Sequence, residues 1–215
     1  PELVDDVIAA VVGPFAESVR ATIQPCTFLL VVPTLAAVVA GAARWQALIA
    51  ATVAGVVGGW VLADNELLLD GIWLRLSAVA AIVLLVVLVS PALRGELPLV
   101  GPRLEHAWPQ AAVVGALTLL ATMWWRPCVG EELGVILNGA QNGLGGQLLP
   151  MTAYMLGALV PVAAVVAVRS ATELPAGVLT PITWVFAAIG IVIAGSLAAG
   201  RHDDVVVTLT RWTLD

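Results

Sequence analysis

The stretch QPCTFLLVVP, Gln24–Pro33, contains one of only two cysteines in this chain of 215 residues. The other lies in WWRPCVGEEL, Trp124–Leu133, and it also follows a proline directly. The two thiols, Cys26 and Cys128, are 102 residues apart, which is close to half of the chain. This spacing predicts two related halves, each with one thiol placed behind a helix-breaking residue.

The prolines before the two cysteines have a direct effect on helix hydrogen bonding. Proline has no N–H, so Pro25 removes the helical partner of the Ala21 carbonyl, and Pro127 removes that of the Met123 carbonyl. In lipid, a freed carbonyl needs a partner within the protein or in a water-lined cavity. Proline kinks that serve packing alone are common in membrane helices. A lone cysteine behind each of these two prolines favours a functional cleft instead.

The composition indicates an integral membrane protein. Hydrophobic residues make up 60% of the chain and charged residues 11%, whereas soluble domains have about a quarter of their residues charged. The net charge of -6 and the absence of lysine exclude a basic surface for nucleic acid.

The charge-free windows predict an all-α integral membrane fold with six transmembrane helices. About 20 apolar residues are needed to cross the hydrocarbon core, and the polar, glycine-rich run Asn138–Gln147 predicts a turn outside it. We expect spans near residues 15–41, 45–63, 71–90, 108–137, 147–168 and 180–200. No separate soluble domain fits, so residues 1–215 form a single membrane domain.

The arginines predict the orientation, because short inside loops are enriched in positive charge. With both termini outside, the inside loops contain Arg44, Arg94, Arg103 and Arg169, and the outside tail contains Arg201 and Arg211. The first three spans, about 15–90, form one repeat, and the last three, about 108–200, form the other. Since three is odd, the second repeat crosses the membrane in the opposite sense, and broken helices in such inverted repeats place functional groups near the midplane.

Three ionisable residues lie near the second cysteine, of which the arginine would favour its thiolate and the two ionised glutamates would oppose it. Arg126 lies two residues before Cys128, and a nearby cation favours the thiolate. Glu131 and Glu132 follow about one helical turn later, where they could pair with Arg126 or accept the thiol proton. An ion-paired structural cluster is the alternative interpretation for these three residues.

The ordered motifs resemble the CcdA/DsbD transmembrane-domain family. RPCVGEELGVIL is similar to the Pro-Cys of that family's fourth helix, through Pro127, Cys128, Gly130, Leu133 and Gly134. TAYMLGALVP is similar to the A-Y-x-L-G-x-x-x-P fifth helix, through Ala153, Tyr154, Leu156, Gly157 and Pro161. QPCTFLLVVP resembles the first helix, and IWLRLSAVAAIVLLVVLV resembles the third, including Trp73, Leu74 and Arg75.

The resemblance implies a thiol–disulfide electron carrier of oxidoreductase type, in which Cys26 and Cys128 are the redox pair. Members of the family take electrons from a cytoplasmic thioredoxin-like donor. They deliver them across the bacterial or archaeal cytoplasmic membrane to an extracytoplasmic thioredoxin-fold protein or apocytochrome, which supports cytochrome c biogenesis. No metal, flavin or haem is expected as cofactor, only the cysteine pair. The chain departs from the family pattern at Leu29 and Glu131, where prolines are usual, and at Pro33, one residue later than expected.

Two other functions fit the same sequence. Kinked inverted repeats with buried acids also suit a small-solute or soft-metal transporter with thiolate ligands. A structural subunit of a larger membrane assembly is the third possibility, in which the run WWR, Trp124–Arg126, makes contacts or anchors the chain at the interface. Loss of function on replacement of either cysteine distinguishes the redox carrier from both.

Overall fold

The computed structural model describes residues 2–22, 31–32, 34–35, 38–39, 45–63, 71–93, 104–124, 144–172, 176–201, 204 and 207–208. Its long elements are all α-helices, so the predicted all-α class is confirmed for the described part of the chain. In chain order they are α1 (Glu2–Ala21), α3 (Trp45–Ala63), α4 (Gly71–Leu93), α5 (Leu104–Met123), α7 (Leu144–Ala158), α8 (Val160–Ala171) and α9 (Ala176–Ala198).

The helices form where long apolar runs lack charged residues. Neither α3 nor α9 contains a charge, and Arg75 is the only charged residue of α4. The last turn of α9 is closed by Gly200, whose φ of 71° lies in the left-handed region that glycine adopts without strain. The N–H of Gly200 donates to the Leu197 carbonyl at 3.0 Å, and that of Arg201 donates to the Ser196 carbonyl at 2.9 Å. Local sequence therefore fixes where this helix stops.

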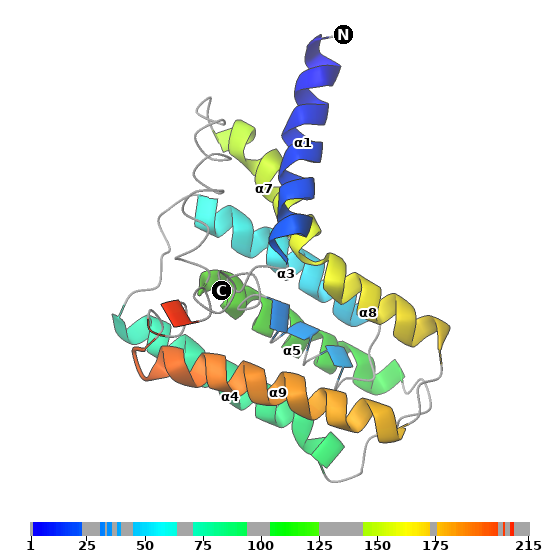
Figure 1. The fold of residues 1–215 in the computed structure, drawn as a ribbon, viewed down its shortest axis with the longest axis vertical. Helices are drawn as coiled ribbons and strands as arrows, with labels where there is room; N and C mark the ends of the chain where they lie inside the picture. Colours follow the sequence, from blue (N-terminus) through cyan, green and yellow to red (C-terminus); the bar gives the residue numbers. More distant parts are fainter. Residues whose placement is uncertain are drawn as a thin grey trace.

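The helices pack in pairs that link the two ends of the chain. The principal contacts are α3 with α5, α1 with α7, α4 with α9, α3 with α7, α4 with α5, α3 with α8, and α7 with α8. Figure 1 shows α4 and α9 running side by side along the lower edge, while α1 and α7 stand together at the top. One hydrophobic core joins α3, α4, α5, α7, α8 and α9 with Val31, Val32, Leu35 and Val38. Its largest fully buried side chains include Trp124, Tyr154 and Leu85.

Small residues on one face of α3 bring it close to its neighbours. A Cβ added at Gly55 would lie 3.2 Å from Leu159 Cδ1, and one at Gly59 would lie 2.7 Å from Met155 Cγ. One added at Gly58 would overlap the Thr122 side chain of α5. Close approach over small residues is characteristic of helix pairs in membranes, and here it places α3 between α5 and α7.

The fifth predicted span is two helices and not one. α7 and α8 meet at Leu159 with a bend of 44°. Pro161 occupies the first turn of α8, where its missing N–H is tolerated. Because Pro161 cannot donate to the carbonyl four residues earlier, the helical ladder is interrupted at this point.

The other bounds agree with the predicted spans to different degrees, and the first span, expected at 15–41, departs most, because α1 runs from Glu2 to Ala21. α3 coincides with the expected 45–63, and α4 starts at the expected residue 71 and ends three residues later than expected. The fourth span was expected to run to 137, but α5 ends at Met123.

By length and composition, Pro181–Ala198 is the only described helix that could cross a membrane alone, and Leu148–Ala158 with Val160–Ala171 passes as a bent pair. Three other described stretches are apolar but shorter than a helix that crosses a membrane alone: Trp45–Val61, Gly71–Val87 and Trp108–Met123.

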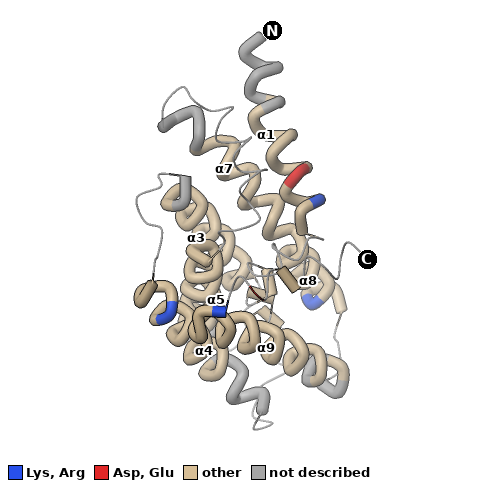
Figure 2. The backbone as a smooth tube through the Cα atoms, turned by 60° about the vertical axis from the view of Figure 1, so that its left-hand side comes forward, with Lys and Arg blue, Asp and Glu red and all other residues tan. Residues whose placement is uncertain are grey.

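Each of the described helices exposes large apolar side chains. On α3, the exposed side chains Trp45, Ile49, Val53, Val57 and Trp60 recur at helical spacing and form one continuous face. Figure 2 shows how few charged residues interrupt the described chain. Soluble monomers rarely expose apolar patches of more than a few hundred Å², so this surface is atypical of a protein surrounded by water.

Candidate functional site

The seven residues of the predicted site lie outside the described residues. They are Pro25, Cys26, Arg126, Pro127, Cys128, Glu131 and Glu132. The structure does describe the helices that lead to both cysteines. It continues to Thr22, four residues before Cys26, and to Trp124, four residues before Cys128.

The two leading helices end at matching positions. α1 ends at Ala21 and α5 ends at Met123, each followed by one described turn residue. These are the two residues whose carbonyls lose a helical partner to Pro25 and Pro127. The helix ends are thus 102 residues apart, as the cysteines are.

The end of α1 is closed by local hydrogen bonds. The N–H of Thr22 donates to the carbonyls of Ser18 at 3.1 Å and Val19 at 3.3 Å. Its hydroxyl donates to the same Val19 carbonyl at 2.6 Å, so this side chain folds back on its own helix. Ala21, the last residue of α1, is buried.

The end of α5 is attached to a different helix. The indole Nε1–H of Trp124 donates to Ser77 Oγ on α4 at 2.8 Å, and the Ser77 hydroxyl donates to the Leu74 carbonyl at 2.7 Å. Trp124 is only 1% exposed. Interfacial anchoring was one interpretation of this tryptophan, and it is wrong for Trp124, which makes its contacts inside the chain. Other tryptophans, Trp45, Trp60, Trp73, Trp108 and Trp184, are exposed.

Buried hydroxyl groups lie along α5 towards the second cysteine. Thr118 Oγ1 is 3.1 Å from Thr34 Oγ1, and both residues are fully buried. Thr118 also donates to the Val114 carbonyl, and Thr122 donates to the Leu119 carbonyl. Since Thr34 follows Cys26 by eight residues, the chain beyond the first cysteine contacts the helix that leads to the second.

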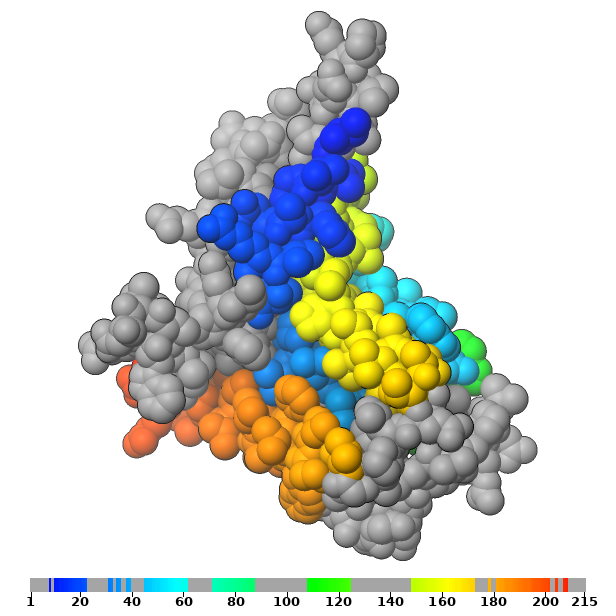
Figure 3. All heavy atoms as spheres, turned by 45° about the vertical axis from the view of Figure 1, so that its right-hand side comes forward, coloured from blue at the N-terminus to red at the C-terminus, as the bar shows by residue number. Residues whose placement is uncertain are grey.

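Two helix crossings next to the site have the same chemical make-up. At the crossing of α1 and α7, a Cβ on Gly157 would lie 2.6 Å from the Phe15 carbonyl oxygen and 2.8 Å from Ser18 Cβ. At the crossing of α3 and α5, Gly58 faces Thr122 in the same way. Figure 3 shows α1 lying against α7 and α8 on one face of the molecule. Within the part of the chain that the structure describes, the buried Ser18 hydroxyl has no hydrogen-bond partner.

The motif residues of the fifth and third helices have packing positions. Tyr154 and Gly157 are buried on α7, Ala153 beside them is also buried, and Leu156 is exposed. On α4, Trp73 is 66% exposed, whereas the Leu74 carbonyl accepts the Ser77 hydrogen bond. The motif therefore marks where the helices cross.

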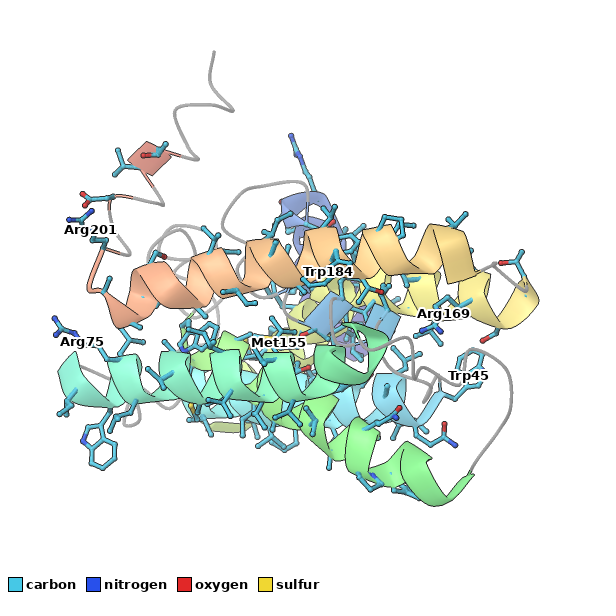
Figure 4. The ribbon with its side chains drawn as sticks, turned by 90° about the horizontal axis from the view of Figure 1, so that it is seen from below. Trp45, Arg75, Met155, Arg169, Trp184 and Arg201 are labelled. Carbon is cyan, nitrogen blue, oxygen red and sulfur yellow. The ribbon has the colours of Figure 1, made fainter. Side chains whose placement is uncertain are left out.

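A half-buried arginine joins α8 to the chain beyond the first cysteine. Arg169 Nη1 donates to the carbonyls of Val38 at 2.7 Å and Val39 at 3.1 Å. Figure 4 shows Arg169 and Trp45 at one end of the molecule and Arg75 and Arg201 at the other. Arg169 thus supplies positive charge at one end of the molecule, and Arg75 and Arg201 supply it at the other.

Known proteins give no further guidance to the site. No family model, no curated protein and no solved structure matches this chain. Within the described ranges, no three His, Cys, Asp or Glu side chains gather where they could hold a metal ion. Nothing in the sequence indicates that Ser77 accepts the Trp124 hydrogen bond. Trp124 itself lies four residues before Cys128, so the 102-residue spacing of the two cysteines does point to its segment.

Proposed function

We propose that this chain is a transmembrane thiol–disulfide electron carrier in which Cys26 and Cys128 form the exchanging pair. In this proposal it is a divergent relative of the CcdA/DsbD membrane domains. The observation that supports it most strongly is the pair of matched helix ends, Ala21 and Met123, which are both placed four residues before a Pro-Cys. Ala21 and Trp124, at these two ends, are both buried.

The proposal places the chain in a bacterial or archaeal cytoplasmic membrane with six spans and both termini outside. The continuous apolar faces of α3, α4 and α9 are compatible with hydrocarbon on all sides. The separation of Arg169 from Arg201 in Figure 4 agrees with an inside and an outside end. Exposed tryptophans near helix ends, such as Trp45 and Trp73, suit the membrane interfaces.

Helix lengths and contacts favour the inverted repeat. α1 and α5 have 20 residues each, and α4 and α9 have 23 residues each. Exchange of the two sets of three spans replaces α1 by α5, α3 by α7 and α4 by α9, and the reverse. This exchange turns the α1–α7 contact into the α3–α5 contact and leaves the α3–α7 and α4–α9 contacts unchanged. A pseudo-twofold relation between the halves would produce this pattern.

Thiol–disulfide exchange gives a balanced reaction for the proposed pair. A thiolate of a thioredoxin-like donor attacks the Cys26–Cys128 disulfide, forming a mixed disulfide and releasing one cysteine thiolate. The donor's second thiol resolves the mixed disulfide, so the donor is oxidised and the pair gains two electrons and two protons. The reduced pair then repeats these steps on the disulfide of an extracytoplasmic acceptor. Arg126 would favour the thiolate, and Glu131 or Glu132 would accept its proton.

Cysteine replacement tests this function. Cys26→Ser and Cys128→Ser should each abolish electron transfer from a reduced thioredoxin to an acceptor disulfide inside sealed vesicles. Each single variant should also accumulate a mixed disulfide with donor or acceptor, visible on a non-reducing gel. A Ser196→Ala variant, altered in α9, serves as the control. Full transfer by the double serine variant would refute the proposal.

A soft-metal transporter is the second candidate, because two thioethers lie deep in the core. Met151 and Met155 are fully buried and adjacent on α7, and both face Gly59 of α3. Methionine sulfur is a suitable ligand for Cu(I). Copper(I) uptake that survives in the double serine variant but is lost in Met151→Leu would favour this function.

A further inference from the structure

Two arginines from distant parts of the chain lie together at one end of the molecule. Arg75 belongs to the second turn of α4, and Arg201 follows the last turn of α9. A Cβ added at Gly200 would lie 2.9 Å from Arg75 Nη2 and 3.6 Å from Arg75 Cζ, so the Arg75 guanidinium rests against the residue before Arg201. Figure 4 shows both arginines at the end of the molecule opposite to Arg169. The packing of α4 against α9 therefore brings two positive charges to one place.

Both guanidinium groups are available to a ligand. Arg75 and Arg201 are exposed, and within the described residues neither side chain makes a hydrogen bond or an ion pair, not even with the exposed Asp204. The Leu197 carbonyl near the end of α9 already accepts the N–H of Gly200. The end of a helix still carries partial negative charge, which favours a cation beside it. This charge stabilises the Arg75 guanidinium near Gly200 and leaves its N–H donors available.

An exposed apolar stripe runs along α4 from the position of Arg75. Its members recur every three or four residues and are all exposed: Ile72, Leu76, Val79, Val83 and Val86. Arg75 lies on the same face of the helix, three residues after Ile72 and four before Val79. A positive group near the head of an apolar stripe is complementary to a molecule with an anionic head and an apolar chain.

We propose that Arg75 and Arg201 bind the phosphate of an anionic phospholipid whose acyl chain lies along the exposed stripe of α4. Guanidinium groups bind phosphate oxygens through paired, charge-assisted hydrogen bonds. Two guanidiniums without an acidic partner favour a headgroup with net negative charge over a zwitterionic one. Arg201 follows Pro181–Ala198, the described helix that could cross a membrane alone, by three residues, which suits the depth of headgroup phosphates. The inference rests on the proposed placement in a membrane but not on thiol exchange.

The test measures the dissociation constant of dihexanoyl phosphatidylglycerol on the purified full chain in a neutral detergent, by native mass spectrometry. An arginine near a membrane surface contributes about 1 kcal/mol to the attraction of anionic lipid, which is about fivefold in affinity. Arg75→Gln and Arg201→Gln should therefore each weaken binding about fivefold, and the double variant about 25-fold. Arg75→Lys keeps the charge without the planar fork, so it should lose less affinity than Arg75→Gln.

Arg20 supplies the matched control for charge. It is also exposed and lies in the last turn of α1, a helix that contributes nothing to the proposed site. Arg20→Gln makes the same change in net charge and should alter the affinity by less than about twofold. Equal losses in Arg20→Gln and Arg75→Gln would indicate attraction to net charge alone and would overturn the site. Unchanged binding in the double variant, with an unchanged circular dichroism spectrum, would overturn it as well.

The acyl-chain part of the proposal is tested at exposed positions of two helices. Leu76→Asn, on the stripe of α4, should weaken phosphatidylglycerol binding about fivefold, because the leucine loses its contact with the chain. Val53→Asn, exposed to a similar extent on α3, should not weaken it. Inorganic phosphate distinguishes a lipid from a free anion, since it should bind far more weakly and should not respond to Leu76→Asn. Inorganic phosphate that binds as tightly as the lipid would overturn the lipid assignment.

Failure of this inference is distinguishable from failure of the proposed function. Alkaline carbonate extraction tests the membrane placement alone, because an integral chain stays with the membrane pellet. Electron transfer in the cysteine variants tests thiol exchange alone, because neither Arg75 nor Arg201 belongs to the proposed exchanging pair. A chain that stays in the pellet, and whose lipid affinity responds to neither arginine, would overturn the lipid site and leave the proposed function standing.

Discussion

Substitution of Gly157 by alanine tests the close crossing of α1 and α7. A Cβ at this position would lie 2.6 Å from the Phe15 carbonyl oxygen and 2.8 Å from Ser18 Cβ. Neither atom can rotate away, because one belongs to the main chain and the other is fixed to it. Relief of the overlap therefore requires α1 and α7 to separate.

The size of the effect follows from two opposing contributions. Overpacking of a close contact costs about 1–3 kcal/mol, whereas glycine to alanine in a helix gains about 1 kcal/mol in intrinsic propensity. Gly195 supplies the matched control, because it also lies near the end of a helix and a Cβ there would meet no atom within 4 Å. The propensity gain is common to both variants and cancels, so Gly157→Ala should be less stable than Gly195→Ala by about 1–3 kcal/mol.

Reversible unfolding in mixed detergent micelles, followed by far-ultraviolet circular dichroism, measures this difference. The free energy of unfolding should fall for Gly157→Ala relative to Gly195→Ala, and Gly195→Ala should match or exceed the unmodified protein. Equal stability of the two alanine variants would mean that α1 and α7 do not approach each other over Gly157. The reasoning about both glycine crossings would then fail.

Three further substitutions follow from buried polar contacts. Ser18→Ala should raise the free energy of unfolding by about 1 kcal/mol, because it removes a buried hydroxyl without a partner; a loss of stability would contradict this. Thr34→Val should lower it by about 0.6 kcal/mol or more through the lost bond to Thr118, a typical value for side-chain bonds between membrane helices, and unchanged stability would contradict the contact. Arg169→Gln should lower the free energy of unfolding by about 1.5–3 kcal/mol, because it removes charged hydrogen bonds to two main-chain carbonyls. The same change at the exposed Arg75 should lower it much less. Equal losses at the two arginines would exclude the Arg169 contact.

The helix positions that could be predicted from the sequence are those bounded by charges. α3 begins after Arg44 and ends before Asp64, and its predicted bounds match the structure. Charge is costly in hydrocarbon, so a charge-free run indicates which residues can form an apolar helix. α5 ends at Met123, and residues 125–137 of the expected fourth span lie outside the described residues. Hydropathy gave no sign of this helix end, because it does not register a missing N–H. The chemistry of Pro127 had already indicated that regular bonding fails at Met123.

Contacts between helices could not be predicted in the same way. Trp124 and Ser77 are 47 residues apart, and nothing in either segment states which helix faces which. An all-round apolar helix such as α4 has no polar face to orient it, so its neighbours are selected by shape, through positions such as Gly58 and Gly157. The residues of the candidate site itself were chosen for their chemistry, and that choice stays a prediction.

A thiol pair that must form and break a bond needs tight control of only one partner's position. A disulfide requires Cα atoms about 4.4–6.8 Å apart, so two independently moving segments would meet in that geometry rarely. Holding one segment through a buried indole lowers the entropy lost at each encounter, because only the other segment has to be ordered. The structure supplies this difference between its two matched helix ends: Trp124 is bonded to a second helix, and Thr22 is bonded to its own. Among the described residues, the helix end before the second Pro-Cys is thereby joined to a neighbouring helix, whereas the helix end before the first is closed by its own last turn.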